Sequence, residues 1–229
     1  EGDSMIGIIT AIEEEAQALL GIMQVKSATE TAGIRFWTGT IEGEDVTMAL
    51  GGVGKALAAM ATTLLIDLCD PDYIINAGVA GGLLETQKVA DLVISSRIIQ
   101  ADYDTSILDG PEGKGKTFDP DLRLVNRARQ IMDTLQMPSE LGIVASQDKF
   151  IALPEDIAFI KSTWPDAACA EMEAGAIAQV ADAFRVPFIA VRALSDVTGH
   201  EDNPMEFEEF ARTAADSTAR FIRSWCASL

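Results

Sequence analysis

The chain has 229 residues, 48% hydrophobic and 23% charged, and its 36 acidic against 17 basic side chains give a formal net charge of −19. This charge argues against a nucleic acid or an anionic membrane surface as partner, because both attract basic proteins. No apolar run approaches the roughly 20 residues of a membrane-spanning helix, and no basic region followed by a long apolar one opens the chain. We therefore expect a cytoplasmic protein.

The composition also favours one compact unit, since a chain of this size and hydrophobic content can bury a large core. We expect a single domain over residues 5–229, preceded by a remnant of recombinant expression at residues 1–4. Cys69, Cys169 and Cys226 lie among apolar or small residues, which is typical of buried reduced thiols. With a single histidine, His200, the sequence offers no His/Cys zinc cluster.

Strand-like and helix-like runs alternate along the chain, which predicts a mostly parallel or mixed β-sheet covered by helices. The β-rich runs predict strands at residues 5–10, 34–41, 46–50, 73–77, 89–99, 141–145, 169–172 and 186–193. Helical spacing predicts helices at residues 13–23, 55–68, 121–135, 154–162, 175–184 and 204–225. Residues 78–82 are predicted as a loop, and residues 102–120 as the longest irregular segment and a candidate site loop or subunit contact.

Carboxylates stand at the ends of two apolar runs. Glu171 and Glu173 close the run at residues 169–172, and Asp196 follows the run at residues 186–193. An ionised carboxylate near a core is costly unless something binds it, so these acids indicate a site. Open α/β sheets bind ligands beyond the carboxyl ends of their strands, where we expect these acids and the segments that begin at residues 13, 51, 78 and 195.

The glycine clusters at residues 51–54 and 78–82 are weak signals by themselves. The first lacks the Gly-Lys-Ser/Thr sequence of a phosphate-binding loop, and neither fits the dinucleotide fingerprint with its acid about 20 residues later. Taken alone, close packing of a helix on a strand is the simpler explanation for both clusters.

Six motifs that occur in order carry a family resemblance: GIITAIEEE at residues 7–15, GVGK at 52–55, NAGVAGG at 76–82, SQDKFI at 146–151, EMEA at 171–174 and VRALSD at 191–196. Together they closely resemble bacterial 5′-methylthioadenosine/S-adenosylhomocysteine nucleosidases, in the purine nucleoside phosphorylase superfamily. The resemblance covers residues 5–229. It implies a three-layer single α/β domain with a central mixed β-sheet flanked by helices, of the nucleoside phosphorylase/hydrolase type.

The resemblance also implies an activity and partners. The enzyme would hydrolyse the N-glycosidic bond of 5′-methylthioadenosine, S-adenosylhomocysteine or 5′-deoxyadenosine to adenine and the 5′-substituted ribose. A homodimer follows from the resemblance, and the apolar residues 98–99 and 107–108 around the variable loop are a weak further hint. No metal and no organic cofactor are implied.

Cleavage of this bond passes through a cation-like ribosyl centre, so the site needs an acid for the departing base and a base that aims water at C1′. By similarity, Asp196 is the general acid that protonates the purine at N7, and Ser195 helps to hold it. Glu15 is similar to the carboxylate that activates the water, with Arg192 as a water or carboxylate partner. Glu173 is similar to the acceptor of the ribose hydroxyl groups, which suits an acceptor-only group.

The remaining site residues also follow from the resemblance. Met172 would lie against the sugar, Phe150 would stack on the purine, and the backbone of Ile151 would read the purine edge. Glu171 is a structural or secondary ligand, and Phe207 is similar to the residue that closes over the 5′-alkylthio group. Without the neighbouring motifs, the apolar members of this set would be ordinary core residues.

Two departures from the family pattern concern the pocket. Val79 stands where many members have serine, so one polar contact near the site is lost. Residues 106–116 match poorly, and in this family that region helps to form the 5′ pocket, partly across a dimer interface. The sequence therefore leaves the preferred 5′-substituent open.

Three alternatives remain at this point. A phosphorylase would need cations for inorganic phosphate, and its relatives place arginine where this chain has Asn76, which favours hydrolysis. Nucleosidases that act on futalosine-type or other 5′-modified purine nucleosides share these motifs. A catalytically silent nucleoside-binding protein would be expected to lack the acid or the base, yet Glu15, Glu173 and Asp196 are all present.

Overall fold

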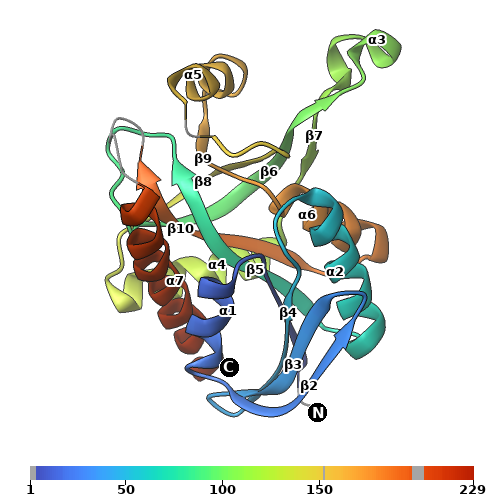
Figure 1. Ribbon diagram of the computed structural model, residues 1–229, viewed down its shortest axis with the longest axis vertical. Helices are drawn as coiled ribbons and strands as arrows, with labels where there is room; N and C mark the ends of the chain where they lie inside the picture. Colours follow the sequence, from blue (N-terminus) through green and yellow to red (C-terminus); the bar gives the residue numbers. More distant parts are fainter. Residues whose placement is uncertain (1–3, 152, 198–203) are drawn as a thin grey trace.

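A computed structural model describes the backbone at residues 4–151, 153–197 and 204–229, and the side chains at the same residues except 197 and 204–208. Within this part, one mixed sheet contains all the strands (Figure 1). They are β1 (Ile6–Thr10), β2 (Gln24–Thr31), β3 (Ile34–Ile41), β4 (Glu44–Leu50), β5 (Tyr73–Gly82), β6 (Leu92–Asp104), β7 (Lys114–Phe118), β8 (Ser139–Ser146), β9 (Ala167–Glu171) and β10 (Phe188–Val197).

The sheet is open at one end and closed on itself at the other. Strands β2, β3 and β4 form an antiparallel meander, and β1 pairs in parallel with both β4 and β5. Strand β5 pairs with β10 as well as with β9, so β5, β10, β6, β8 and β9 form a closed ring of strands. Because β1, β5 and β10 are parallel, their carboxyl ends meet at one edge.

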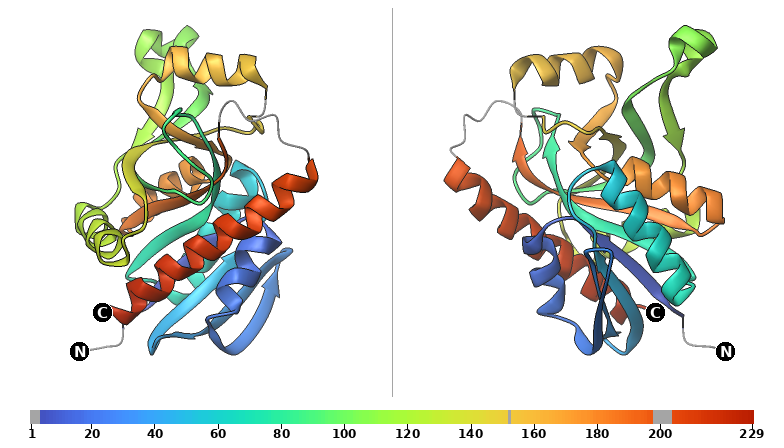
Figure 2. Two further views of the ribbon diagram at one scale, coloured as in Figure 1. Left: turned by 90° about the vertical axis from the view of Figure 1, so that its left-hand side faces the viewer. Right: turned by 45° about the vertical axis from the view of Figure 1, so that its right-hand side comes forward.

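Helices cover both faces of the sheet, as Figures 1 and 2 show. On one face lie α1 (Glu13–Leu20), α4 (Leu122–Leu135) and α7 (Pro204–Ala227), and on the other α2 (Lys55–Cys69) and α6 (Ala174–Phe184). Two further helices, α3 (Ser106–Asp109) and α5 (Pro154–Thr163), and a 3₁₀ turn at Gly110–Gly113 complete the described elements. The predicted three-layer fold with a mixed sheet is therefore confirmed.

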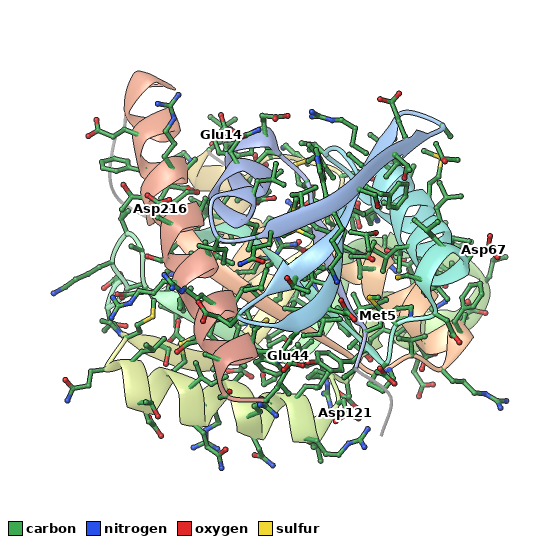
Figure 3. All side chains as sticks on the ribbon, turned by 90° about the horizontal axis from the view of Figure 1, so that it is seen from below. Met5, Glu14, Glu44, Asp67, Asp121 and Asp216 are labelled. Atoms are coloured by element: carbon green, nitrogen blue, oxygen red, sulfur yellow. The ribbon has the colours of Figure 1, made fainter. Side chains whose placement is uncertain are left out.

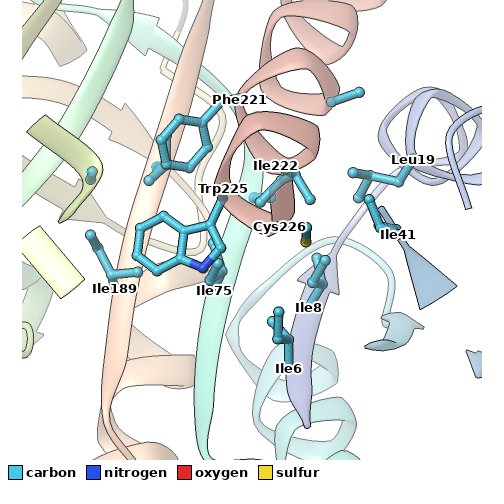
Figure 4. Close-up of a cluster of buried hydrophobic side chains, with 14 of the residues drawn as sticks. Ile6, Ile8, Leu19, Ile41, Ile75, Ile189, Phe221, Ile222, Trp225 and Cys226 are labelled. Atoms are coloured by element: carbon cyan, nitrogen blue, oxygen red, sulfur yellow. The ribbon is translucent and has the colours of Figure 1, made fainter. Parts of the chain in front are cut away.

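Each face has its own hydrophobic core. In Figure 4, Trp225 and Phe221 of α7 lie against Ile75 and Ile189 of the sheet, and the indole Nε1 of Trp225 donates to Tyr73 Oη at 2.9 Å. On the opposite face, α6 buries mainly alanines and α2 buries Ala58 and Ala61, which lets the two helices pack closely against each other and the sheet. Acidic residues such as Asp67 and Asp216 point outward into solvent (Figure 3).

Several sequence predictions of local structure are wrong. Residues 78–82, predicted as a loop, belong to β5, because they pair with β10 from Gly78 to Gly82. The predicted helix at residues 13–23 ends at Leu20, and β2 was not predicted because all its residues are exposed and carry no hydrophobic alternation. Residues 102–120, predicted as irregular, contain the end of β6, α3 and β7, which together form an arm that extends away from the body (Figures 1 and 2).

No helix in the described residues is both long and apolar enough to cross a membrane. The sequence also predicts a helix cap at Asn203, just before the proline that begins the last helix. Asn203 and the single histidine, His200, lie outside the described residues.

Candidate active site

A cavity of about 230 Å³ opens at the edge where β1, β5 and β10 end. Its lining includes nearly all the residues that the sequence singled out; Arg192 lies directly behind the wall, and Phe207 lies outside the described side chains. The lining residues are Ala11, Ile12, Glu15, Val53, Val79, Ala80, Gly81, Lys149, Phe150, Ile151, Ala170, Glu171, Met172, Glu173, Ser195 and Asp196.

Glu15 is held rigidly in the cavity wall by backbone N–H groups. It lies in the first turn of α1, and its Oε2 accepts hydrogen bonds from Ala11 N at 2.7 Å and Ile12 N at 3.2 Å. Its Oε1 accepts from Val79 N at 2.8 Å. Burial raises the pKa of Glu15, while the nearby Arg192 guanidinium and these N–H groups lower it. The three hydrogen bonds thus fix the orientation of the carboxylate, and burial outweighs the opposing effects, so its pKa lies above the ordinary value.

Gly78 allows Glu15 and Arg192 to approach each other across β5. A Cβ atom at this position would lie 2.7 Å from Glu15 Oε1 and would also overlap Arg192 Nη1. The glycine is therefore required by the close approach of two charged side chains, and the sequence had suggested only helix packing for this cluster.

Arg192 is the buried cation behind the site. It lies on β10 with 1% of its surface exposed. Its Nη2 donates to Asn76 Oδ1 at 2.6 Å and to Glu171 Oε2, and lies 3.6 Å from Glu173 Oε2. Burial opposes its charge, but the surrounding carboxylates raise the pKa of Arg192. A permanently charged guanidinium thus compensates the buried acids.

Glu171 is engaged by protein donors on both oxygens. Its Oε1 accepts from Ser146 Oγ, and its Oε2 accepts from Glu173 N at 3.0 Å and Ala174 N at 2.8 Å, besides Arg192. The last two N–H groups belong to the start of α6, where an anion is favoured by the helix dipole. Glu171 therefore orients the segment that carries Glu173. Of the two roles predicted for Glu171, structural or secondary ligand, these contacts fit the structural one.

Glu173 also lines the cavity, and its carboxylate accepts fewer hydrogen bonds from the protein than that of Glu15 or Glu171. It is 6% exposed, and its Oε1 accepts from Gly54 N at 3.0 Å. Burial, together with the neighbouring Glu171, raises the pKa of Glu173 to about 7, against the opposing effects of Arg192 and the Gly54 N–H. The Glu173 carboxyl therefore titrates near neutral pH.

Asp196 and Ser195 come from the end of β10, where the pairing with β5 is interrupted by a bulge between Leu194 and Asp196. Such a bulge changes the direction of the next side chains. Ser195 Oγ donates to Asp196 Oδ1 at 2.9 Å, and Asp196 faces Gly81 of β5, where a Cβ atom would lie 3.1 Å from its Oδ2. Asp196 thus lies on the wall next to β5.

Apolar side chains complete the cavity. Phe150 and Ile151 come from the loop after β8, and Met172 follows β9 instead of belonging to it. Phe150 is 55% exposed, which places a ring at the mouth where a planar ligand would cover it. Val79 contributes its backbone, because its N–H binds Glu15 and its carbonyl oxygen accepts from Arg192 Nη1 at 3.4 Å.

Comparisons with known proteins identify the family of the chain. A model of the phosphorylase superfamily matches residues 5–226. The 5′-methylthioadenosine/S-adenosylhomocysteine nucleosidase of Geobacillus thermodenitrificans is 38% identical over 222 residues, which cover 95% of this chain and 94% of the relative. The chain belongs to this nucleosidase family. A second member, from Hydrogenovibrio crunogenus, is 37% identical over 222 residues, which cover 95% of this chain and 95% of that relative.

Solved structures place the nucleosidase among close structural relatives. The family member from Neisseria meningitidis, in complex with methylthio-immucillin-A, has a TM-score of 0.92 and 32% identity, with 99% of this chain and 100% of that chain covered. The futalosine hydrolase of Helicobacter pylori has a TM-score of 0.91 and 27% identity, with 99% of both chains covered. The predicted family and fold are confirmed.

The structure of this nucleosidase adds residues to which the sequence gave no role in the site. Ser146 binds Glu171 and accepts from Gly175 N at 2.7 Å, and Asn76 binds Arg192 while donating to the Ile9 carbonyl oxygen at 3.1 Å. Asn76 lies inside the apolar part of β5, and Ser146 ends the apolar run at residues 143–145 of β8. A polar residue in such a run is the signal that could have revealed them, because buried polar groups need partners.

Proposed function

We propose that this nucleosidase hydrolyses the N-glycosidic bond of 5′-modified adenine nucleosides, 5′-methylthioadenosine and S-adenosylhomocysteine among them. The products are adenine and the 5′-substituted ribose. One observation carries the proposal: Glu15, Glu173 and Asp196, which are far apart in the sequence, line a single apolar cavity of about 230 Å³. Separate carboxylates can divide acid, base and binding roles within one site.

The proposed mechanism uses each carboxylate for a different atom. Asp196 protonates N7 of the purine as the bond between C1′ and the base breaks and its electron pair moves to the base. Glu15 takes a proton from water, and the water oxygen bonds to C1′. Glu173 accepts hydrogen bonds from the ribose hydroxyl groups. One water molecule is consumed, its hydroxide going to the sugar, and the base leaves with the proton from Asp196. The proton taken up by Glu15 is released to solvent and Asp196 takes one from solvent, which restores the starting state.

The apolar part of the cavity supports the binding side of the proposal. Phe150 at the mouth would stack on the purine, the Ile151 backbone would read its edge, and Met172 would lie against the sugar. An apolar, water-poor wall strengthens the electrostatic effect of the neighbouring acids on the developing charge at C1′.

The cations near the cavity favour water over phosphate as the acceptor. Arg192 is bound to Glu171 and Asn76, and Lys149, the cation among the described lining residues, pairs with Asp156 of α5. A phosphorylase needs cationic groups that are available to an incoming phosphate. Both cations here are already compensated by protein groups.

A homodimer and a cytoplasmic location are part of the proposal. The arm of β6, α3 and β7 carries Ile107 and Leu108, which are 98% and 84% exposed, and Phe159 of α5 is 61% exposed. Such large exposed apolar side chains are typical of a surface that a second subunit covers.

The decisive experiment is incubation with 5′-methylthioadenosine with and without inorganic phosphate. Adenine and methylthioribose released at the same rate in both supports hydrolysis. Product that requires phosphate would make the protein a phosphorylase, and binding without product would make it a silent nucleoside-binding protein. Rates for S-adenosylhomocysteine, 5′-deoxyadenosine, adenosine and a futalosine, measured in parallel, determine the preferred 5′-substituent. Fastest turnover of the futalosine would contradict the substrate class proposed.

A further inference from the structure

Behind the mouth of the cavity, Lys55, Asp102 and Asp148 form a polar cluster that we call the clamp. Lys55 begins α2, Asp102 lies on β6, and Asp148 lies in the loop after β8. Lys55 Nζ donates to Asp102 Oδ1 at 2.6 Å, and the backbone N–H of Asp148 donates to Asp102 Oδ2 at 2.9 Å. The backbone N–H of Lys55 donates to Asp148 Oδ1 at 2.8 Å, which closes the cluster.

The clamp meets the catalytic cavity at the start of α2. Two successive backbone N–H groups at this helix start bind carboxylates: that of Gly54 donates to Glu173 Oε1 at 3.0 Å, and that of Lys55 donates to Asp148 Oδ1. Gly54 has a φ of +99°, a conformation that favours glycine, and a Cβ atom here would lie 3.2 Å from Asp148 Oδ1. One helix start therefore holds both the ribose acceptor and the loop of Asp148.

The loop held by the clamp carries the residues assigned to the purine. Phe150 and Ile151 follow Asp148 directly, and both line the cavity. The described residues between Ser146 and Pro154 form neither helix nor strand, and Asp148, Lys149 and Phe150 are exposed. Such a segment has little backbone pairing of its own, so side-chain links decide its position.

The Lys55–Asp102 pair is better placed to hold the loop of Asp148 in position than an ordinary surface ion pair. The Lys55 side chain is 17% exposed and that of Asp102 is 35% exposed. By contrast, the Lys26–Asp45 pair, at 2.9 Å, has a lysine that is 62% exposed and lies at the remote β2 edge. Exposed pairs contribute little; here the lysine is largely buried and Asp102 also accepts from the Asp148 N–H, so two links hold its geometry.

We propose that Lys55, Asp102 and Asp148 are positioning residues that fix the Phe150 loop relative to Glu173, so that purine and ribose are bound at a set separation. This inference rests on the proposed function, in which these two residues bind the two halves of the nucleoside. Without the clamp the loop is less ordered, so part of the binding free energy is used to order it when the nucleoside binds. The affinity for the nucleoside therefore falls more than kcat does.

The first experiment compares Lys55→Met, Asp102→Asn and Lys55→Arg with the control Lys26→Met, which breaks the exposed pair. In Lys55→Met and Asp102→Asn we expect KM for 5′-methylthioadenosine to rise about tenfold and kcat to change less than about threefold, as for lost pre-organised binding. Lys55→Arg should recover part of the affinity, and Lys26→Met should match the wild type. An unchanged KM in Lys55→Met would overturn the proposal.

A double-mutant cycle separates positioning from simple destabilisation. If the clamp acts through the loop, Lys55→Met should raise KM much less in a Phe150→Leu background than in the wild type. Fully additive effects, or a loss of affinity that only follows a lowered Tm, would contradict positioning. Dissociation constants for the nucleoside, measured by calorimetry with every variant in an Asp196→Asn background, give the same comparison without turnover. Wild-type protein that binds but does not hydrolyse would contradict the proposed function alone, and the calorimetric cycle would still decide the clamp.

Discussion

At the residue scale, Asp196 and Glu15 have different surroundings, which match the different roles proposed for these two carboxyl groups. Glu15 accepts hydrogen bonds from three backbone N–H groups and lies near a guanidinium, so it is held as an acceptor. Asp196 accepts from Ser195 and faces β5 at the wall assigned to the purine. This difference suits a base on one side of the sugar and an acid at the leaving group.

We expect Asp196→Asn to keep nucleoside binding and to lose kcat by about 10²–10⁴-fold, because only the transferable proton is removed. Glu15→Gln should lose turnover to a similar extent, since water is no longer deprotonated. Steady-state rates with calorimetric dissociation constants measure both effects. The substitution Glu14→Gln, one residue away on α1, is the matched control, and near-normal turnover in Asp196→Asn would disprove its role.

Glu173 should make stability depend on pH near neutrality. Its folded-state pKa of about 7 lies above the ordinary glutamate value of 4.5, which we take for the unfolded chain, so between these values the folded protein binds the proton more tightly than the unfolded chain. The stabilisation from this carboxyl is fully present when the pH is below the ordinary pKa of 4.5, and it is lost as the pH rises through about 7. The free energy of unfolding of Glu173→Gln, relative to the wild type, should therefore increase from pH 5 to pH 8.

Denaturant unfolding of both proteins across this pH range measures the difference, on the order of 1 kcal/mol or more per pKa unit shifted. A difference that is flat with pH would show that Glu173 titrates normally. The unprotonated form is also the better acceptor for ribose hydroxyl groups, so kcat/KM should fall as the pH is lowered through about 7.

At the element scale, the central feature is β5, whose last residues are small so that charged groups from α1 and β10 can meet across it. We expect Gly78→Ala to move Glu15 and Arg192 apart, to reduce kcat/KM by at least about tenfold and to destabilise the fold by roughly 1–3 kcal/mol, as for overpacking. The control is Gly21→Ala at the end of α1, where φ is −62°. A fully active Gly78→Ala enzyme would contradict this account of the strand.

The arm of β6, α3 and β7 is the second element with a testable role. If a partner subunit covers it, Leu108→Asp should weaken the homodimer, because a charge would be buried in an apolar contact. Sedimentation velocity should then show a monomer at concentrations where the wild type is dimeric. Val25→Asp, at an exposed position on β2, is the control, and an unchanged dimer in Leu108→Asp would place the interface elsewhere.

At the scale of the whole molecule, the sheet brings distant motifs into one cavity. Glu15 arrives from the first helix, Glu173 from the start of α6 and Asp196 from the end of β10. The parallel pairing of β1, β5 and β10 places their carboxyl ends together, and the closed ring from β5 to β9 brings Glu171 and Glu173 to the same edge. The sequence predicted this meeting of segments from the alternation of strands and helices.

The sequence by itself determined the family, the layered α/β fold and most helices and strands, since hydrophobic periodicity, glycines and the six motifs are local properties of the chain. It did not determine that residues 78–82 are a strand, that Asn76 holds Arg192, or that Glu171 is bound by Ser146 and the start of α6. Each of these depends on a partner far away in the sequence. Only the tertiary structure decides which polar groups become buried together, because the cost of burying a charge drives it to a partner that local sequence does not reveal.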